Sequence, residues 1–436
     1  MKQLLTQTRS FPPAARLLMV NQFAINLAFS MLMPYLAAHL AGDLALAAWA
    51  VGLVLGVRNL SQQGMFLIGG TLADRFGYKA PIMAGCLLRT VGFALLGWAD
   101  GLPALLVASA ATGLAGALFN PAVRAYLAAE AGPRRVAAFA TFNVYYQAGM
   151  LLGPVVGLGL LAVDFRAVCT AAAVIFAGLT VLQARALPPR HAPTPEGGGS
   201  GAVGGPAAPA GTLSVWGQWR QVVSHRPFLL FAAAMTGSYV LTFQVYLVLP
   251  LAAQGALGED GTKVTSGLFV LSAAVAVAGQ LRLTGWATRR LTSHRALVAG
   301  CAATGAAYVP LAVTPVTSRA GMPVALLLSV AALAAAGALV YPFEMDTIVS
   351  LCGNRLVATH YGLYNTVTGL GITVGNLALG ALWDAVGTSA PWLVWTVLAA
   401  TGAGCAAALA ALAHGGHLTP AGPAAAERPE GERSAA

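Results

Sequence analysis

The segment GGTLADRFGYK (69–79) lies between two long apolar blocks, at about 47–70 and 80–99. Each block is long enough for a helix that crosses a lipid bilayer, which needs roughly 20 apolar residues. The segment itself carries three charged side chains, Asp74, Arg75 and Lys79. It therefore predicts a short polar loop between two membrane-spanning helices.

The composition of the whole chain supports this interpretation. The sequence has 436 residues, of which 58% are apolar and 9% are charged, and its mean hydropathy is +0.73. Soluble domains carry roughly 25% charged residues, and disordered chains need low hydrophobicity. A soluble enzyme and a disordered protein are both excluded. The net charge of +10 does not indicate nucleic-acid binding, because the basic residues recur in short gaps between apolar blocks.

The apolar blocks are spaced as in a protein that crosses the membrane many times. Helices satisfy their own backbone groups in lipid, whereas the alternating pattern of a transmembrane barrel is absent. The predicted fold class is an all-α polytopic membrane protein with twelve transmembrane helices. The blocks lie at about 16–40, 47–70, 80–99, 103–128, 136–161, 166–186, 227–252, 266–286, 295–314, 322–348, 359–383 and 390–413.

The distribution of Lys and Arg fixes the predicted orientation. With twelve spans both ends lie on one side, and 17 of the 24 basic residues fall in segments on that side. The opposite loops hold three, namely Arg166, Lys263 and Arg319. Cytoplasmic loops carry the excess of positive charge. Both termini are therefore predicted to be cytoplasmic.

One long gap divides the series six plus six. Residues 187–214 are rich in Pro, Gly and Ala, as in flexible linkers, and 214–227 predict a short interfacial helix with Trp216 and Trp219 at the headgroups. The predicted organisation is an N-terminal six-helix bundle, a cytoplasmic linker with that short helix, a C-terminal six-helix bundle and a disordered cytoplasmic tail. Their ranges are 1–186, 187–226, 227–413 and 414–436.

The two halves repeat one another. AGALFNP (115–121) returns as AGALVYP (336–342), and at the same offset Gly132 and Arg134 match Gly353 and Arg355. After a slip of one residue, three further positions of the next span match, namely Asn143, Gly149 and Gly153 with Asn365, Gly371 and Gly375. Parallel repeats related about the membrane normal are one transporter architecture, with the binding site between the halves. The bundles are predicted to be pseudo-symmetric.

The loop 69–79 carries a recognisable set of residues. Gly70 and Gly77 allow tight turns and close approach, and a carboxylate such as Asp74 suits the amino end of a neighbouring helix. Together with Arg75 and Lys79, these residues resemble the signature of the major facilitator superfamily, G-x-x-x-D-R/K-x-G-R/K-R/K. Tyr78 replaces one of the usual basic residues.

A second motif lies in the fifth span. In AGMLLGPVVG (148–157), Gly149, Gly153 and Gly157 share one helix face, and Pro154 removes a backbone hydrogen bond. One interpretation is close helix packing. The other is the G-x-x-x-G-P-x-x-G element of the exporter branch of that superfamily, which this stretch resembles.

The resemblance extends over most of the chain. Segments 51–79, 87–97 and 243–250 resemble the twelve-span drug:proton antiporters of bacteria, close to the MdtH-type multidrug exporters. It implies two bundles around a central cavity, location in the bacterial inner membrane, a monomer, and export of small amphipathic molecules in exchange for protons. It also implies a gate in which Asp74 contacts the next half near Thr359, while Arg75 or Lys79 pairs with Glu130.

The sequence departs from that pattern in three places. The first span has no acid, since Val20 precedes Asn21 where relatives carry Asp, and the early part of the fourth span lacks an Arg. The loop TGWATRRLTSHR after the eighth span has no Asp. The second half therefore lacks a full copy of the gate motif. Because the first span has no acid and the early fourth span no Arg, the sequence supports proton coupling less strongly than it supports the fold.

Charged residues inside spans are costly, so they tend to face a cavity or a partner. For Arg58 and Arg89 a structural hydrogen-bond network and a cavity role are both open, and Arg124 is expected to reach the inner interface. The acids Glu344 and Asp346 are the candidates for proton coupling. They are also able to form a cytoplasmic salt-bridge gate or to lie at the interface without a role.

Ten polar or aromatic residues are candidates for the substrate cavity, because rings with a few polar groups suit mixed apolar ligands. Packing and headgroup anchoring are the alternative for each tyrosine. The candidates are Asn21, Asn26, Arg58, Gln62, Arg89, Tyr146, Tyr239, Gln244, Tyr364 and Asn365.

No pattern in the sequence indicates chemistry. It has no phosphate-binding loop, no G-x-S-x-G elbow and no metal-ligand spacing, so no catalytic residue, metal or cofactor is predicted. The predicted function is secondary export of drug-like molecules by proton antiport, with substrate, protons and the bilayer as partners. A uniporter or importer of a small metabolite is the alternative, and a membrane-embedded sensor or enzyme is a third.

Overall fold

The computed structural model describes residues 2–190, 214–257, 260–315, 318, 321–386 and 389–418. These residues are almost entirely helical, and no strand occurs among them. The apolar blocks explain this, because a helix pairs its own backbone groups without water. The all-helical part of the predicted fold class is confirmed.

The first half of the chain contains seven α-helices and one short 3-10 turn. They are α1 (Lys2–Arg9), α2 (Pro13–Gly42), α3 (Ala48–Phe76), α4 (Lys79–Trp98), α5 (Leu102–Ala131), η1 (Gly132–Arg134), α6 (Arg135–Leu161) and α7 (Phe165–Ala186).

The second half begins with the short helix α8 (Val215–Val223), which Ser214 caps by accepting a hydrogen bond from the Gly217 backbone. The remaining elements are α9 (Arg226–Phe243), η2 (Gln244–Tyr246), α10 (Val248–Leu257), α11 (Asp260–Arg290), α12 (Ser293–Ala306), α13 (Val309–Val313), α14 (Gly321–Leu351), α15 (Val357–Val386) and α16 (Pro391–His414).

Ten helical segments in the described part of the chain are long and apolar enough to cross a membrane. One of them, Leu102–Leu161, runs through both α5 and α6, and α3 is not among the ten. Arg58, Asn59, Gln62 and Gln63 in the middle of α3 lower its hydropathy. The number twelve therefore stays a prediction.

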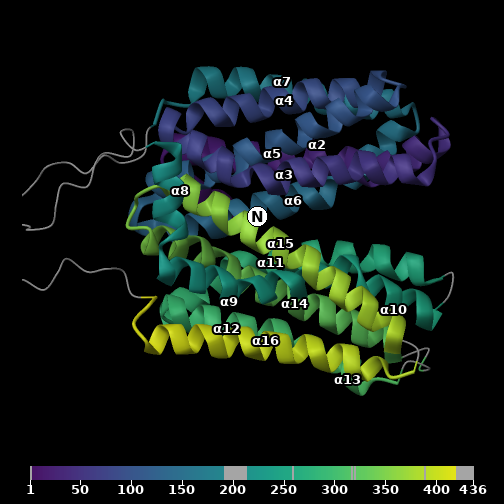
Figure 1. Ribbon diagram of the computed structural model, residues 1–436, viewed down its shortest axis with the longest axis vertical. Coiled ribbons are helices and arrows are strands. Elements are labelled where there is room, and N and C mark those ends of the chain that lie inside the picture. The colour runs from purple at the N-terminus through teal and green to yellow at the C-terminus, as the bar shows by residue number, and fades with distance from the viewer. Residues whose placement is uncertain are drawn as a thin grey trace, which may run out of the picture.

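The helices form two groups that lie side by side (Figure 1). In the first half α3 and α4 pack on α5, while α2 packs on α6 and α7. In the second half α14 packs on α11 and α12, while α16 packs on α12 and α9. The groups meet where α3 and α5 contact α15 and where α6 contacts α11 and α14. The interface between the halves is thus built mainly on α15 of the second half and on α6 of the first.

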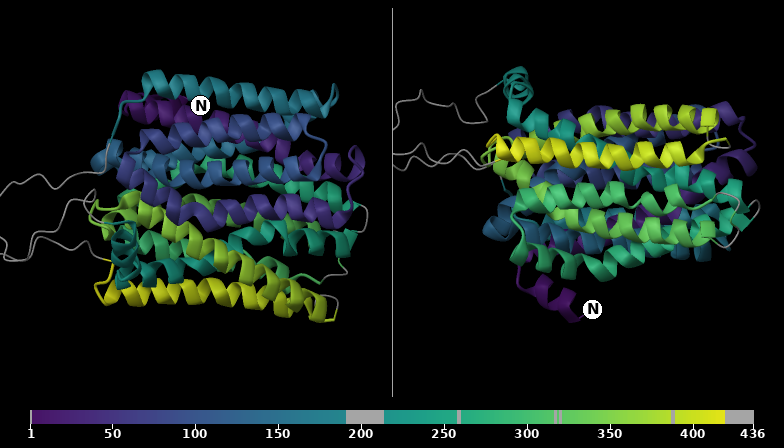
Figure 2. Two further views of the ribbon diagram at one scale, coloured as in Figure 1. Left: turned by 45° about the horizontal axis from the view of Figure 1, so that its top comes forward. Right: turned by 90° about the horizontal axis from the view of Figure 1, so that it is seen from below.

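The helices run roughly parallel along the whole molecule, as Figure 2 shows from two further sides. We call the end where α7 finishes and α9 begins the linker end; it lies at the left of Figure 1, where α8 is drawn. We call the opposite end the far end. The starts of α4, α6 and α15 also lie at the linker end.

The sequence repeat is visible in the backbone. Pro121 lies inside α5 and its counterpart Pro342 lies inside α14. After these two helices the chain turns at Gly132 and Gly353, with φ of 52° and 57°. Side chains other than glycine rarely adopt such angles, which explains glycine at both turns. The halves therefore share local geometry as well as sequence.

The domain boundaries expected from the sequence stay predictions. Residues 191–213 of the expected linker and 419–436 of the expected tail lie outside the described residues. The helix α8 occupies the place where a short interfacial helix is expected. Its Trp216 side chain is 74% exposed, whereas Trp219 donates its indole N–H to the Thr71 hydroxyl of α3 at 2.9 Å.

Candidate functional site: a cavity between the halves

A cavity of about 410 Å³ lies between the two halves. Its walls come from α2, α3, α5 and α6 of the first half and from α9, η2, α11, α14 and α15 of the second. This volume is in the range of small-molecule sites. The polar and aromatic residues of the wall are Gln22, Gln62, Gln63, Phe66, Asn120, Arg124, Phe142, Asn143, Tyr146, Gln147, Ser238, Tyr239, Thr242, Phe243, Tyr246, Ser272, Tyr341, Glu344, Asn365 and Thr368.

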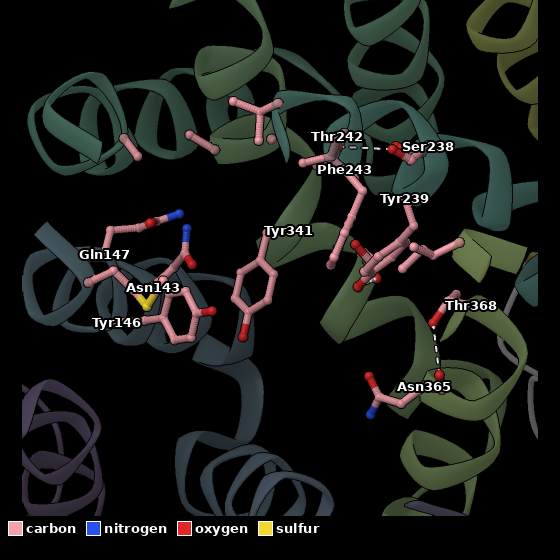
Figure 3. A pocket seen from close by; sticks show the side chains of 18 of the residues that line it. Asn143, Tyr146, Gln147, Ser238, Tyr239, Thr242, Phe243, Tyr341, Asn365 and Thr368 are labelled. Carbon is pink, nitrogen blue, oxygen red and sulfur yellow. Dashed lines mark hydrogen bonds between the residues drawn. The ribbon is translucent and has the colours of Figure 1, made fainter. Parts of the chain in front are cut away.

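Amides and aromatic rings dominate this wall, and Figure 3 shows several of them from close by. Tyr341 of α14 lies between Tyr146 of α6 and Asn365 of α15. Aromatic faces with a few fixed polar groups bind amphipathic molecules, because rings offer area at little entropic cost. The cavity is thus suited to a ligand that is part apolar and part polar.

The positive charge of the cavity comes from Arg124 of α5. Its guanidinium donates to the Asn365 side-chain oxygen of α15 at 3.0 Å, and this hydrogen bond joins the two halves. The expectation that Arg124 reaches the inner interface is wrong, because the side chain lines the cavity.

The negative charge comes from Glu344 of α14. Its side chain is buried, and the Tyr239 hydroxyl of α9 donates to its Oε1 at 2.7 Å. Asp346, two residues later, does not line the cavity. The two candidate acids therefore occupy different environments.

Four of the ten predicted cavity residues line the cavity: Gln62, Tyr146, Tyr239 and Asn365. Asn21 and Asn26 are buried in α2, where Asn26 donates to the Gln22 carbonyl, while Gln22 itself faces the cavity. Tyr364 is buried between the rings of Phe231 and Tyr239.

Arg58 and Arg89 lie within the first half, outside the cavity wall. Their guanidinium carbons lie 5.0 and 5.6 Å from the centre of the same ring, Phe29. Arg89 also lies over Phe119 and Phe176. Arg58 shares a helix face with Gln62, but its head group turns to Asn59 and Phe29. Of the two readings, the contacts favour a structural network.

Gln244 lies where the helix of the seventh predicted span is interrupted. The span divides into α9, η2 and α10, with Leu247 outside helical geometry at φ −126° and ψ −78°. The Gln244 amide donates to the Val240 carbonyl at 2.7 Å and to Asn376 of α15 at 3.0 Å. Irregular backbone at membrane depth is tolerated where it is buried or lines a cavity. Thr242, Val245 and Tyr246 around this break line the cavity.

The linker end of the interface is closed first by α3 against α15. Asp74 is buried, and its carboxylate accepts the Ala358 N–H at 3.1 Å and the Thr359 N–H and hydroxyl, each at 2.7 Å. A helix amino end carries unpaired N–H groups and partial positive charge. The contact expected between Asp74 and the region of Thr359 is present.

Glycines bring the backbones of α3 and α15 together. A Cβ at Gly70 would overlap the Ala358 carbonyl, and one at Gly362 would overlap the Phe66 carbonyl. Gly77, at the end of α3, has φ of 83°, which side chains rarely adopt. Close backbone contact therefore requires glycine at position 70, and the backbone angle φ requires it at position 77.

The basic residues of the motif have other partners than expected. Glu130 pairs with Arg190 at 2.7 Å, and Lys79 donates to the Ala184 carbonyl at 2.8 Å. Arg75 is exposed beside the Phe76 ring. The expected pairing of Glu130 with Arg75 or Lys79 is therefore wrong. Arg190, just after α7, pairs with Glu130 instead.

The linker end is closed a second time by α6 against α11 and α14. Arg135 Nε donates to Asp346 Oδ1 at 2.7 Å, and the guanidinium also reaches Asn354 and Ser350. Deeper in the interface, Asn143 donates to Gln280 at 2.7 Å, and Gln280 donates to the Ala338 carbonyl at 2.6 Å.

The second sequence motif packs inside the first half. Cβ atoms at Gly149, Gly153 and Gly157 would meet the backbone or side chains of α2. The Pro154 carbonyl accepts a hydrogen bond from the Tyr35 hydroxyl of α2 at 2.7 Å. Close packing of α6 on α2 accounts for the small residues of this face.

A sequence model of the Major Facilitator Superfamily matches residues 18–376. The chain belongs to the major facilitator superfamily. It is therefore a membrane transporter and not an enzyme, and its partners are the lipid bilayer and a small-molecule substrate.

Curated relatives within this family are bacterial. The uncharacterized MFS-type transporter Rv0849 of Mycobacterium tuberculosis is 55% identical over 380 residues, which cover 86% of this chain and 87% of that protein. Multidrug resistance protein MdtH of Yersinia pestis is 31% identical over 303 residues, or 68% of this chain and 69% of that protein. The resemblance stated from the sequence motifs is confirmed.

Solved structures of the family share the fold. The human organic anion transporter MFSD10 has a TM-score of 0.66 at 14% identity, covering 91% of this chain and 100% of that one. The E. coli fucose:proton symporter FucP has a TM-score of 0.68 at 15% identity, covering 91% and 98%. At such identities the likeness concerns the fold alone.

Proposed function

We propose that this transporter exports small amphipathic, drug-like molecules across the bacterial inner membrane in exchange for protons. The observation that carries the proposal is the cavity between the halves, which holds a buried carboxylate, Glu344, among aromatic and amide side chains. A carboxyl group in such a place can take up and release a proton as its surroundings change. The similarity to multidrug resistance protein MdtH adds support for a drug-like cargo.

Alternating access needs an interface that closes at one end and opens at the other. The hydrogen bonds of Asp74 and the ion pair of Arg135 between the halves lie at the linker end. In this state the linker end is closed. Rocking of the two halves about the cavity would break these contacts and open the cavity toward the linker end.

The proposal gives the two acids different tasks. Glu344 faces the cavity and is the proton-coupling group, whereas Asp346 pairs with Arg135 at the closed end. Asp346 thus supports closure, and its protonation would weaken the ion pair. Coupling of transport to protons would then involve Glu344 directly and Asp346 indirectly.

The arrangement in the membrane is part of the same proposal. Twelve spans, with both termini and the linker end cytoplasmic, agree with the excess of Lys and Arg in the segments on that side. The boundaries 1–186, 187–226, 227–413 and 414–436 and the monomeric state belong to it as well.

The test is export from proteoliposomes that contain the purified protein. Vesicles are loaded with a fluorescent cationic dye, and efflux is compared with and without an imposed pH gradient. We expect gradient-dependent transport that Glu344→Gln uncouples, whereas Asp384→Asn, at an exposed position of α15, leaves it unchanged. Transport that ignores the pH gradient would contradict antiport and favour a uniporter or importer of a metabolite.

A further inference from the structure

The cavity wall holds one cationic side chain, Arg124, and one acidic side chain, Glu344. Arg124 extends from α5 of the first half, and its guanidinium donates a hydrogen bond to a neutral amide, Asn365. It interacts electrostatically with Tyr341, Tyr239, Tyr361 and Glu344 of the second half and with Tyr146 of the first half. Arg124 therefore faces across the interface.

Glu344 faces the same space from α14. Its carboxylate also accepts a hydrogen bond from a neutral group, the Tyr239 hydroxyl. Among the described residues the ion pairs are His39–Asp43, Arg135–Asp346 and Arg190–Glu130. Arg124 and Glu344 thus interact through space without an ion pair within 4 Å.

Two opposite charges that line one cavity without forming an ion pair are an unusual arrangement. Removing a charge from water costs free energy unless an opposite charge or several hydrogen bonds replace the water. Direct contact between Arg124 and Glu344 would satisfy both, yet the two side chains line the cavity from α5 and α14 without forming one of the ion pairs named above. The arrangement leaves room for a molecule that brings its own two charges.

The surface between the two charges is largely aromatic. Tyr341 lies between Tyr146 and Asn365, and Phe243 points toward the same space (Figure 3). Rings of this kind favour an apolar or aromatic body. They also bind a cation weakly through their faces, which adds to the attraction for an amine.

We propose that the cargo is a zwitterionic amphiphile, whose anionic group binds Arg124 and whose protonated amine faces Glu344, with an apolar body between them. This inference rests on the proposed function. An anion alone would leave Glu344 without a counter-charge, and a cation alone would leave Arg124 without one. A proton and an ammonium group would then compete for Glu344, as exchange transport requires.

The test uses four forms of one dipeptide, phenylalanyl-phenylalanine. The free peptide is zwitterionic, the amide is cationic, the N-acetyl form is anionic and the doubly blocked form is neutral. Binding to the full-length protein in lipid nanodiscs is measured by calorimetry at pH 7.5. Each form keeps the same aromatic body, so the differences report the charges.

We expect the zwitterion to bind best, with each blocked end weakening binding about tenfold or more, as for charge-assisted hydrogen bonds in a buried site. In Arg124→Gln the free acid and the amide should bind alike, whereas the effect of blocking the amine persists. In Glu344→Gln the reverse should hold. Arg282→Gln, which removes an exposed guanidinium of α11, should keep both preferences.

The proposal is overturned if the four forms bind equally to the wild type, or if a preference survives removal of its assigned side chain. Arg124→Lys guards against misfolding, because it keeps the charge and should retain part of the preference for the free acid. Dye export in proteoliposomes is measured on the same preparations. Gradient-driven export without any charge preference in binding would contradict the zwitterion and leave the proposed function intact.

Discussion

The two interfaces that close the linker end use different chemistry. Between α3 and α15, backbones touch at Gly70 and Gly362, and the buried Asp74 binds backbone N–H groups. Between α6 and α14, Arg135 and Asp346 form an ion pair whose side chains keep 21% and 18% of their exposure. The interface between α3 and α15 is buried and uses backbone groups. The interface between α6 and α14 is partly exposed and uses side chains.

This difference shows that a repeated backbone does not imply repeated chemistry. The turns at Gly132 and Gly353 match, and so do Pro121 and Pro342. The loop after α11 nevertheless has no Asp to correspond to Asp74, so α6 is held by a cation of its own, Arg135. Salt screens the buried carboxylate of Asp74 little, whereas it screens the partly exposed ion pair more strongly.

Cys352 offers a measurement of both interfaces. It lies between α14 and α15, and its thiol is buried. Burial, and to a smaller extent the nearby charge of Asp74, raises the pKa of this thiol to about 12. Since the thiolate is the reactive form, maleimide labelling of Cys352 should be slow while the linker end is closed. A Cys352→Ser background corrects for labelling at the other cysteines.

The largest effect is expected for Asp74→Ala. It leaves the N–H groups of Ala358 and Thr359 without their acceptor, and breaking a buried charged contact costs roughly 3–5 kcal/mol. We expect loss of transport and labelling of Cys352 at least about tenfold faster. Unchanged labelling would mean that the contact does not hold the linker end closed.

A smaller effect is expected for Gly70→Ala. This variant keeps the charge of Asp74, so a change in labelling would report opening of the linker end and not the loss of that charge near Cys352. The added methyl would overlap the Ala358 carbonyl, and overpacking of this kind costs about 1–3 kcal/mol. Labelling of Cys352 should rise and transport should fall.

The matched control is Gly64→Ala in the same helix. A Cβ at Gly64 meets nothing within 4 Å, so transport and labelling should equal those of the wild type. Equal damage from both alanines would show that helix flexibility, and not contact with α15, explains the motif glycine.

A third effect is expected for Trp219→Phe in α8. It removes one hydrogen bond to Thr71 of α3, which is worth about 0.5–1.5 kcal/mol. Cys352 labelling should rise by a few-fold at most. Trp216→Phe changes an exposed indole and should have no such effect; a larger response there would indicate that α8 acts through the lipid surface.

The smallest effect is expected for Arg135→Gln. A partly exposed ion pair contributes about 0–1 kcal/mol and is screened by salt. Labelling of Cys352 should rise slightly at low salt and converge with the wild type at high salt. The double variant Arg135→Asp with Asp346→Arg should restore slow labelling of Cys352. If it does not, the ion pair does not contribute to closure of the linker end.

Much of the fold was predictable because the bilayer leaves few choices. Apolar blocks must be helical there, and the blocks at 80–99 and 166–186 correspond closely to α4 and α7. The contact of Asp74 with the start of α15 was also predictable, since a buried carboxylate and an open helix end satisfy one another. Both are local consequences of residue type.

The cavity was predictable only in part, because the face that a helix turns inward depends on its neighbours. Gln62 lines the cavity while Arg58, one turn away, does not. Arg124 enters the cavity although its position along α5 suggested the interface. The break between α9 and α10 had no clear signal, since Gln244 finds its partner Asn376 on another helix.

The sequence by itself determined the helices, the repeat, the family and the glycines that permit close contact. These follow from hydropathy, spacing and backbone freedom, which act within a few residues. Tertiary structure alone decided that Glu344 faces the cavity while Asp346 pairs with Arg135, and that Glu130 pairs with Arg190. A buried charge needs a partner that offsets the cost of removing it from water. The packing of the helices decides which side chains, often far apart in sequence, lie close enough to be that partner.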